Sequence, residues 1–125
     1  MIERAKEILT NGGHACVLMR GDIVLTSGRR GVHQLLEWDL DGAYIADKVV
    51  GKAAASIMIC GGVREVYATI MSRAAIDLLT EYGMKFSFGR EVEAIRRRDG
   101  TGICPMEQAC LGLKTAEECF EILRA

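Results

Sequence analysis

The sequence predicts an α/β domain in which helices are layered against a sheet. Segments with apolar residues at helical spacing alternate with short apolar runs that have the spacing of strands. A hairpin signal near the N-terminus is followed by strands separated by helical segments, the pattern of parallel strands joined by helices. There is no linker, internal repeat or low-complexity stretch, so we expect residues 1–125 to form a single domain.

The N-terminal part predicts a helix followed by a hairpin. Apolar residues at helical spacing indicate a helix from Ile2 to Thr10. Ala15 to Met19 is a short apolar run typical of a buried strand, and Ile23 to Thr26 follows a glycine-containing turn as the return strand. We expect the residues from Ser27 to Gly42 to form a partly buried loop.

The middle of the sequence predicts two helices and two strands. The apolar positions from Ala43 to Cys60 form two adjacent rows with i, i+4 spacing, which predicts one long helix. Glu65 to Ile70 follows as a strand. Ser72 is then the N-cap of a helix from Arg73 to Tyr82, and Met84 to Phe88 alternates like another strand.

The C-terminal part predicts two short helices. The stretch from Glu91 to Arg98 fits either a short strand or one to two helical turns. Proline is favoured at the first position of a helix, so Cys104-Pro105 predicts a short helix that reaches about Leu111. Thr115-Ala116-Glu117-Glu118 has the spacing of a capping box and opens a last helix to Leu123.

Composition excludes several classes of protein. Half of the residues are hydrophobic and the formal net charge is −1, which argues against disorder and against sequence-independent nucleic-acid binding. No apolar run is long enough for a membrane span, and the N-terminus lacks a signal core, so we expect a cytoplasmic protein. The odd number of five cysteines indicates reduced thiols. We expect Cys16, Cys60 and Cys119 to pack in the core.

The first candidate for chemistry is Cys104. A cysteine at a helix N-terminus tends to have a lowered pKa and therefore more of the nucleophilic thiolate. Glu107, the third residue of the same helix, is a candidate to orient or deprotonate a substrate, although a carboxylate there also stabilises the helix end. Backbone N–H groups of the glycine-rich loop before Cys104 could bind an anion. The residues expected to contact it are Arg98, Gly100, Thr101 and Gly102. Alternatively, this loop is an ordinary turn and Cys104 is simply buried.

The second candidate lies in the expected long helix. Lys48 and Lys52 would form a like-charge i, i+4 pair, and Gly51 would lower helix stability by about 1 kcal/mol relative to alanine. Two unfavourable features on one face suggest that a ligand, or the backbone of another element, approaches closely there. We therefore take Lys52 and Asp47 as candidate catalytic residues and Lys48 as a candidate ligand-binding residue.

Two motifs carry a resemblance to a known family. Ala46-Asp47-Lys48-Val49-Val50-Gly51-Lys52-Ala53-Ala54-Ala55 and Asp99-Gly100-Thr101-Gly102-Ile103-Cys104-Pro105-Met106-Glu107 together resemble an uncharacterised prokaryotic domain family of unknown function, numbered 1893. The fold of that family resembles cytidine deaminase. The resemblance covers nearly the whole chain and implies a three-layer α/β/α domain with a mixed sheet of about five strands.

The zinc motifs of deaminases are absent from the expected positions. Zinc deaminases begin the second helix with His-x-Glu, or Cys-x-Glu, and the third with Pro-Cys-x-x-Cys. Here the second expected helix offers Asp47, Lys48 and Lys52 near its start, and the third begins at Ser72-Arg73. We therefore expect no cofactor and no zinc-dependent deamination. A divergent zinc site of Cys104, Cys60 and a histidine is a weaker alternative, for which we expect no stoichiometric zinc.

Two functional hypotheses follow. In the first, a zinc-independent site binds a small nucleotide-like or anionic ligand, with Cys104 as a nucleophile or redox-active thiol and Lys52 lowering its pKa or binding the anion. Glu107 or Asp47 would then move protons. In the second, the chain is a non-catalytic ligand-binding or protein-interaction domain that has kept the fold and lost deaminase chemistry. A homo-oligomer is compatible with either hypothesis.

Overall fold

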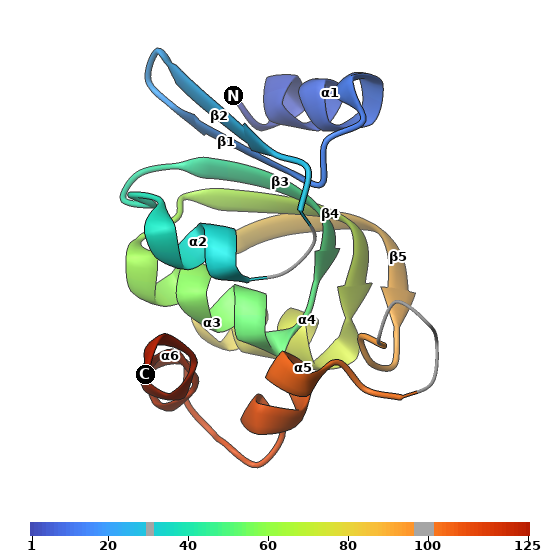
Figure 1. Ribbon diagram of the computed structural model, residues 1–125, viewed down its shortest axis with the longest axis vertical. Helices are drawn as coiled ribbons and strands as arrows, with labels where there is room; N and C mark the ends of the chain where they lie inside the picture. Colours follow the sequence, from blue (N-terminus) through green and yellow to red (C-terminus); the bar gives the residue numbers. More distant parts are fainter. Residues whose placement is uncertain (30–31, 97–101) are drawn as a thin grey trace.

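The computed structural model describes residues 1–29, 32–96 and 102–125, and Figure 1 shows the arrangement of its helices and strands. The elements in chain order are α1 (Ile2–Gly12), β1 (Cys16–Arg20), β2 (Ile23–Ser27), α2 (His33–Glu37), β3 (Tyr44–Val50), α3 (Lys52–Gly61), β4 (Glu65–Ser72), α4 (Arg73–Glu81), β5 (Lys85–Val92), α5 (Pro105–Cys110) and α6 (Ala116–Arg124).

The five strands form one mixed, open sheet in the order β2-β1-β3-β4-β5 (Figure 1). β1 is antiparallel to both of its neighbours, β2 and β3. β3, β4 and β5 run parallel to one another, and α3 and α4 make the connections between them. The expected hairpin followed by helix-connected parallel strands is therefore confirmed.

Helices cover both faces of the sheet. α1 packs on one face, against β1, β3 and β4, and forms a small core there with Tyr67. α3 and α4 pack on the opposite face, and α2, α5 and α6 pack against α3 from outside. The predicted α/β class is confirmed, with α3 at the centre of the larger core.

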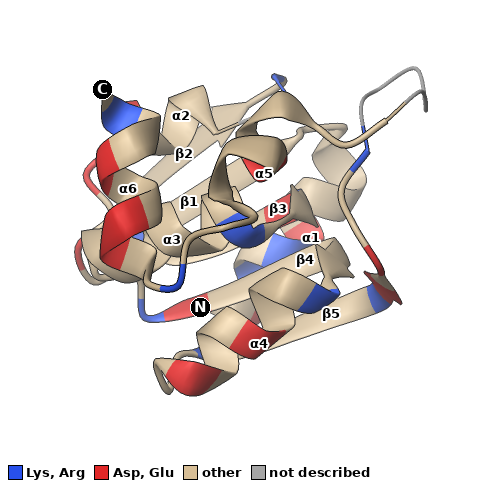
Figure 2. Ribbon diagram, turned by 90° about the horizontal axis from the view of Figure 1, so that it is seen from below, with Lys and Arg blue, Asp and Glu red and all other residues tan. Residues whose placement is uncertain are grey.

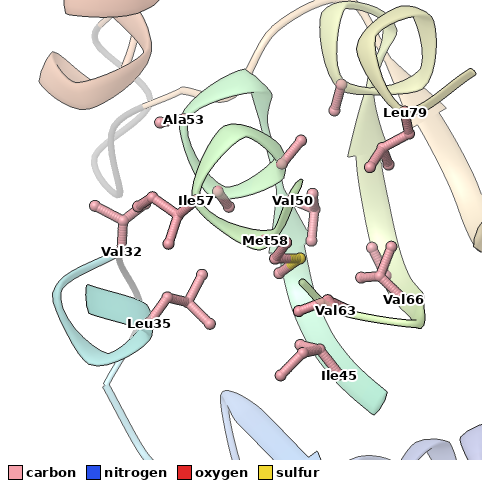
Figure 3. Close-up of a cluster of buried hydrophobic side chains, with 14 of the residues drawn as sticks. Val32, Leu35, Ile45, Val50, Ala53, Ile57, Met58, Val63, Val66 and Leu79 are labelled. Atoms are coloured by element: carbon pink, nitrogen blue, oxygen red, sulfur yellow. The ribbon is translucent and has the colours of Figure 1, made fainter. Parts of the chain in front are cut away.

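The larger core fills the space between α3 and the sheet, as Figure 3 shows. Val50 and Val66 come from the strands, and Ile57 and Met58 come from α3; all four are essentially inaccessible to water. Burying a side chain of this size contributes about 1.5–3 kcal/mol. The position of α3 on the sheet is therefore fixed by the packing of its first two turns, Ala53 to Met58.

The expectation of one helix from Ala43 to Cys60 is wrong. The structure divides this stretch into β3 and α3, and Gly51 between them is the N-cap of α3 with an extended backbone. Tyr44–Val50 is rich in β-branched and aromatic residues, and Ile45, Ala46 and Asp47 are buried in succession, so both faces of the strand are covered there. After Tyr44, its apolar residues come in adjacent pairs, Ile45-Ala46 and Val49-Val50, which also match the two helical rows. Consequently Lys48 and Lys52 are not an i, i+4 pair.

Two further segments differ from, or refine, the expectation. The predicted loop from Ser27 to Gly42 contains α2, a five-residue helix whose Leu35 is buried. Such a short helix provides too little periodicity to be recognised. In the ambiguous stretch that starts at Glu91, β5 continues to Val92, and Arg96 forms an isolated antiparallel bridge with Ile103. Arg97 and Arg98 lie outside the described residues.

The two predicted helix starts with side-chain caps are confirmed. The Ser72 hydroxyl accepts a hydrogen bond from the Ala75 N–H, at 3.2 Å. At the start of α6, Thr115 and Glu118 form the complete capping box, in which each side chain accepts a hydrogen bond from the backbone N–H of the other residue. These local signals are reliable because both partners lie within four residues of sequence.

The surface mixes charges of both signs. Acidic and basic residues occur together on α4 and α6 (Figure 2). Within the part of the chain that the structure describes, no helix is both long and apolar enough to cross a membrane. β2 is an edge strand on which Ile23, Val24 and Leu25 are exposed. The expected homo-oligomer stays a prediction, and an exposed apolar edge of this kind is suited to strand pairing between copies.

Candidate functional site

Glu107 caps helix α3 from a distant part of the sequence. Its Oε2 atom accepts a hydrogen bond from the Lys52 N–H at 3.0 Å, and its Oε1 atom accepts one from the Ala53 N–H at 2.8 Å. The side chain is almost fully buried. The first N–H groups of a helix have no partner within the helix, and a carboxylate there also interacts favourably with the helix dipole. Glu107 therefore has a clear structural task.

Gly51 provides the space for this carboxylate. A Cβ atom at position 51 would lie 2.7 Å from Oε2 of Glu107, and closer still to Oε1. The backbone of Gly51 is extended, so the restriction comes from this close approach and not from a left-handed conformation. The sequence-based expectation placed Gly51 inside a helix and named a ligand or a backbone as the approaching group; in the structure the approaching group is the Glu107 side chain.

Lys52 lies beside Glu107 and extends the same contact. Its Nζ atom donates a hydrogen bond to the Leu113 carbonyl in the segment between α5 and α6. Burial raises the pKa of the Glu107 carboxyl above its usual range, and the two N–H donors and the Lys52 ammonium oppose this effect. Together these bonds attach the α5–α6 segment to the start of α3.

Asp47 pairs with a different residue. It is buried in β3 directly opposite Cys16 of β1, and its Oδ1 atom accepts a hydrogen bond from the Val49 N–H at 3.3 Å. Burial, and then the Asp47 carboxylate, raise the pKa of the Cys16 thiol well above its ordinary value. The structure thus brings Lys52 together with Glu107, and Asp47 together with Cys16.

Cys104 is the N-cap of α5, as predicted, and is half-buried. Its N–H donates to the Ile95 carbonyl at 3.0 Å, and its carbonyl accepts from the Gln108 N–H at 2.9 Å. Its thiol makes no capping hydrogen bond to this six-residue helix. The position is therefore held by the backbone, and a chemical role for the thiol stays a prediction.

The predicted anion-binding loop is only partly described. Arg98, Gly100 and Thr101 lie outside the described residues, so nothing in the structure tests them. Gly102 is half-buried and directly precedes the bridge at Ile103. The remaining candidate, Lys48, lies on the opposite face of the sheet from α3 and lines a groove.

We call this cavity the Lys48 groove. It has a volume of about 750 Å³ and lies beside the last turn of α1, where β3 and β4 approach their carboxyl ends. Its polar lining residues are Thr10, Lys48, Tyr67 and Thr69, and its main apolar ones are Leu9, Ala15, Val49 and Ile70. A volume of this size is typical of sites for small organic molecules.

An irregularity in the strands places two consecutive residues of each strand in the groove. In β4, Ala68 and Met71 both pack in the core on the α3 side, although a regular strand returns to the same face every second residue. Thr69 and Ile70 between them both line the groove. β3 has the same feature, since Lys48 and Val49 both line it. Sequence periodicity gave no signal for this irregularity.

The cation in the groove is Lys48. Its side chain is exposed, and none of the carboxylates in the described ranges forms an ion pair with it. Tyr67 is held in place by Lys6, whose Nζ atom lies 4.5 Å from the centre of the Tyr67 ring. The groove therefore combines one positive charge, hydroxyl groups and apolar walls.

The five cysteines are all free, and they differ in exposure. Cys60 was expected in the core, but it is exposed near the end of α3, so that prediction is wrong; Cys16 and Cys119 are buried as expected. Cys110 is buried too, and burial together with the neighbouring Cys119 thiol raises the pKa of Cys110 to about 12.

We expect iodoacetamide to label two thiols, Cys60 and Cys104, in the folded protein. The other three should react only when the chain unfolds, because alkylation needs an accessible thiolate. Mass spectrometry of peptides from native and urea-treated samples checks this. Rapid labelling of Cys110 in the folded protein would contradict the burial described here.

The described residues contain no metal centre of the usual kind: no three side chains of His, Cys, Asp or Glu are grouped so that they could hold an ion. The comparison with zinc deaminases also changes, because the second helix of the chain is α2. α2 begins at His33, with Leu35 where His-x-Glu needs glutamate, and the third helix begins Lys52-Ala53 without a cysteine.

Fold and groove together define an α/β fold with a mixed five-stranded sheet and a groove in which Lys48 lies among apolar side chains. The family model for a domain of unknown function, DUF1893, matches residues 4–125, and the chain belongs to this family. A crystal structure of a DUF1893 family protein from Thermotoga maritima is similar, with a TM-score of 0.88 and 28% sequence identity. The match covers 98% of this chain and 86% of that one. No curated protein matches the chain. The likeness to cytidine deaminase stays a prediction.

Proposed function

We propose that this protein binds a small organic anion in the Lys48 groove. The observation that carries the proposal is the position of Lys48, an unpaired cation within the described structure, in a cavity lined by hydroxyl-bearing and apolar side chains. Ligand sites commonly have this composition, with a mostly apolar lining and a few polar groups that orient the ligand. In parallel sheets they also lie preferentially near the carboxyl ends of the strands.

The proposed ligand has an anionic group and a less polar body. The anionic group would contact the Lys48 ammonium and the Thr69 hydroxyl, and the body would cover Val49 and Ile70. Nucleotide-like molecules fit this description, and they are the ligand class of the first functional hypothesis drawn from the sequence. The side chains of the groove would bind the ligand without a metal.

Catalysis by Cys104 with Lys52, Glu107 and Asp47 stays a separate proposal. In the structure Lys52 and Glu107 use their polar atoms to hold α5 and α3 together. This arrangement favours the non-catalytic hypothesis, in which the domain binds a ligand without transforming it. The binding proposal does not depend on any of these four residues.

The test is a titration with adenosine 5′-monophosphate, followed by amide chemical shifts and by calorimetry. We expect saturable binding with shifts at Lys48, Thr69 and Ile70, and about tenfold weaker binding to Lys48→Met, since a charge-assisted hydrogen bond contributes about 1.5–3 kcal/mol. Adenosine, which lacks the phosphate, should bind both proteins equally weakly.

Lys85→Met is the control for loss of a lysine elsewhere: Lys85 is exposed at the start of β5, away from the groove, and pairs with Glu65 at 3.7 Å. Its affinity for the monophosphate should equal that of the wild-type protein. Chemical shifts confined to other surfaces, or an unchanged affinity in Lys48→Met, would refute the proposal.

A further inference from the structure

A second groove adjoins the Lys48 groove along the ends of the parallel strands. We call it the Arg90 groove; it has a volume of about 510 Å³. Its lining includes Val49, Ile70, Arg90, Val92, Ile95 and Arg96. Val49 and Ile70 line both grooves. The two cavities therefore share a wall, and a molecule in one is in reach of the other.

Strand register places the two cations on either side of this shared wall. Val49, Ile70 and Arg90 are direct partners across β3, β4 and β5. Neighbouring strands are about 4.8 Å apart, so the Cα atoms of Val49 and Arg90 are separated by roughly 10 Å. Lys48 precedes Val49, and both charged side chains are long enough to reach towards a ligand that crosses Ile70.

Gly89, next to Arg90, allows a close approach of β4. A Cβ atom at this position would lie 2.9 Å from the Thr69 carbonyl oxygen and 3.5 Å from the Tyr67 hydroxyl, which lines the Lys48 groove. A larger residue at position 89 would therefore displace Thr69, which also lines the Lys48 groove.

The charges of the Arg90 groove suit a second anionic group. Its charged lining residues are Arg90, Arg96 and Glu93, and Arg90 is the candidate partner of the anion. Arg90 is exposed, and no carboxylate in the described part of the chain forms an ion pair with it. A guanidinium also recognises phosphate and carboxylate groups through paired hydrogen bonds.

We infer that the natural ligand spans both grooves and carries two separated anionic groups, one held at Lys48 and the other at Arg90. This inference rests on the proposed function and specifies the class of ligand: an organic bis-anion such as a nucleoside bisphosphate. The central part of the molecule lies over Val49 and Ile70. A ligand with one anionic group uses the Lys48 groove alone.

The test compares ligands that differ in where the second charge lies. Adenosine 3′,5′-bisphosphate carries its phosphates at separate positions, whereas adenosine 5′-diphosphate carries both at one end. By calorimetry we expect the bisphosphate to bind at least about tenfold more tightly than the monophosphate, and the diphosphate to bind within about threefold of it. The position of the second charge, and not the total charge, should determine the gain.

Arg90→Met should abolish the tighter binding of the bisphosphate relative to the monophosphate. Its affinity for the monophosphate should stay within about twofold of wild type. Lys85→Met, at the opposite end of β5, should keep the gain. Equal affinities for the bisphosphate and the monophosphate, or a gain that persists in Arg90→Met, would overturn the inference while the Lys48 site stands. Failure of the monophosphate to bind at Lys48 would instead refute the proposed function, and this inference with it.

Discussion

Replacing Glu107 by alanine is expected to lower the free energy of unfolding by about 3–5 kcal/mol. The substitution removes the only side chain that the described structure places on the N–H groups of Lys52 and Ala53, and it leaves these buried donors without partners. An unsatisfied buried donor destabilises a fold by about 1–3 kcal/mol, and the lost packing of the side chain adds to this. Urea unfolding followed by circular dichroism measures the change.

Glu118→Ala is the matched control for this prediction. Glu118 also accepts a backbone N–H at a helix start, but it is exposed, so water replaces the lost bond. We expect this change to lower stability by about 1 kcal/mol. If Glu107→Ala lowers the free energy of unfolding no more than Glu118→Ala does, the buried Glu107 cap contributes no more to stability than an exposed cap. Should the Glu107→Ala variant fail to fold, Glu107→Gln, which keeps one acceptor, is measured instead. Its loss in free energy of unfolding should lie between the loss for Glu118→Ala and the loss expected for Glu107→Ala.

Local signals in the sequence predicted most of the fold. The caps at Ser72 and Thr115, the hairpin and the alternation of helices with strands were correct, because each depends on residues a few positions apart. The long helix from Ala43 to Cys60 was wrong because the apolar residues of β3 come in adjacent pairs and do not alternate with polar ones. Only tertiary contacts decide between strand and helix in such a run.

The candidate site was harder to predict, because it depends on contacts between distant segments. Glu107 and the start of α3 are more than fifty residues apart in sequence, and the Lys48 groove is built from α1, β3 and β4. Lys48 was taken as a candidate ligand-binding residue because it would form a pair with Lys52 on a helix. It lies instead in a strand, where it lines the groove. Arg90 had no sequence signal, since one arginine in an alternating strand is unremarkable until the register places it opposite Ile70.

The close approach of the Glu107 carboxylate to Gly51 leads to the second prediction of a large loss of stability. Gly51→Ala is expected to destabilise the protein by about 2–4 kcal/mol, although alanine at a helix N-cap normally differs from glycine by much less. The added Cβ would displace the Glu107 carboxylate and break both of its hydrogen bonds. Urea unfolding again provides the measurement, with Gly28→Ala as a control, because a Cβ at position 28 meets no atom within 4 Å.

A double-mutant cycle separates this mechanism from a general intolerance of side chains at position 51. If the clash with Glu107 is the cause, Gly51→Ala should matter little in the Glu107→Ala background, because the displaced carboxylate is already absent. In that background we expect it to lower the free energy of unfolding by less than about 0.5–1 kcal/mol. The coupling energy would then nearly equal the effect of the single substitution. Additive effects would mean that Gly51 and Glu107 stabilise α3 independently, and Gly51 would need another explanation.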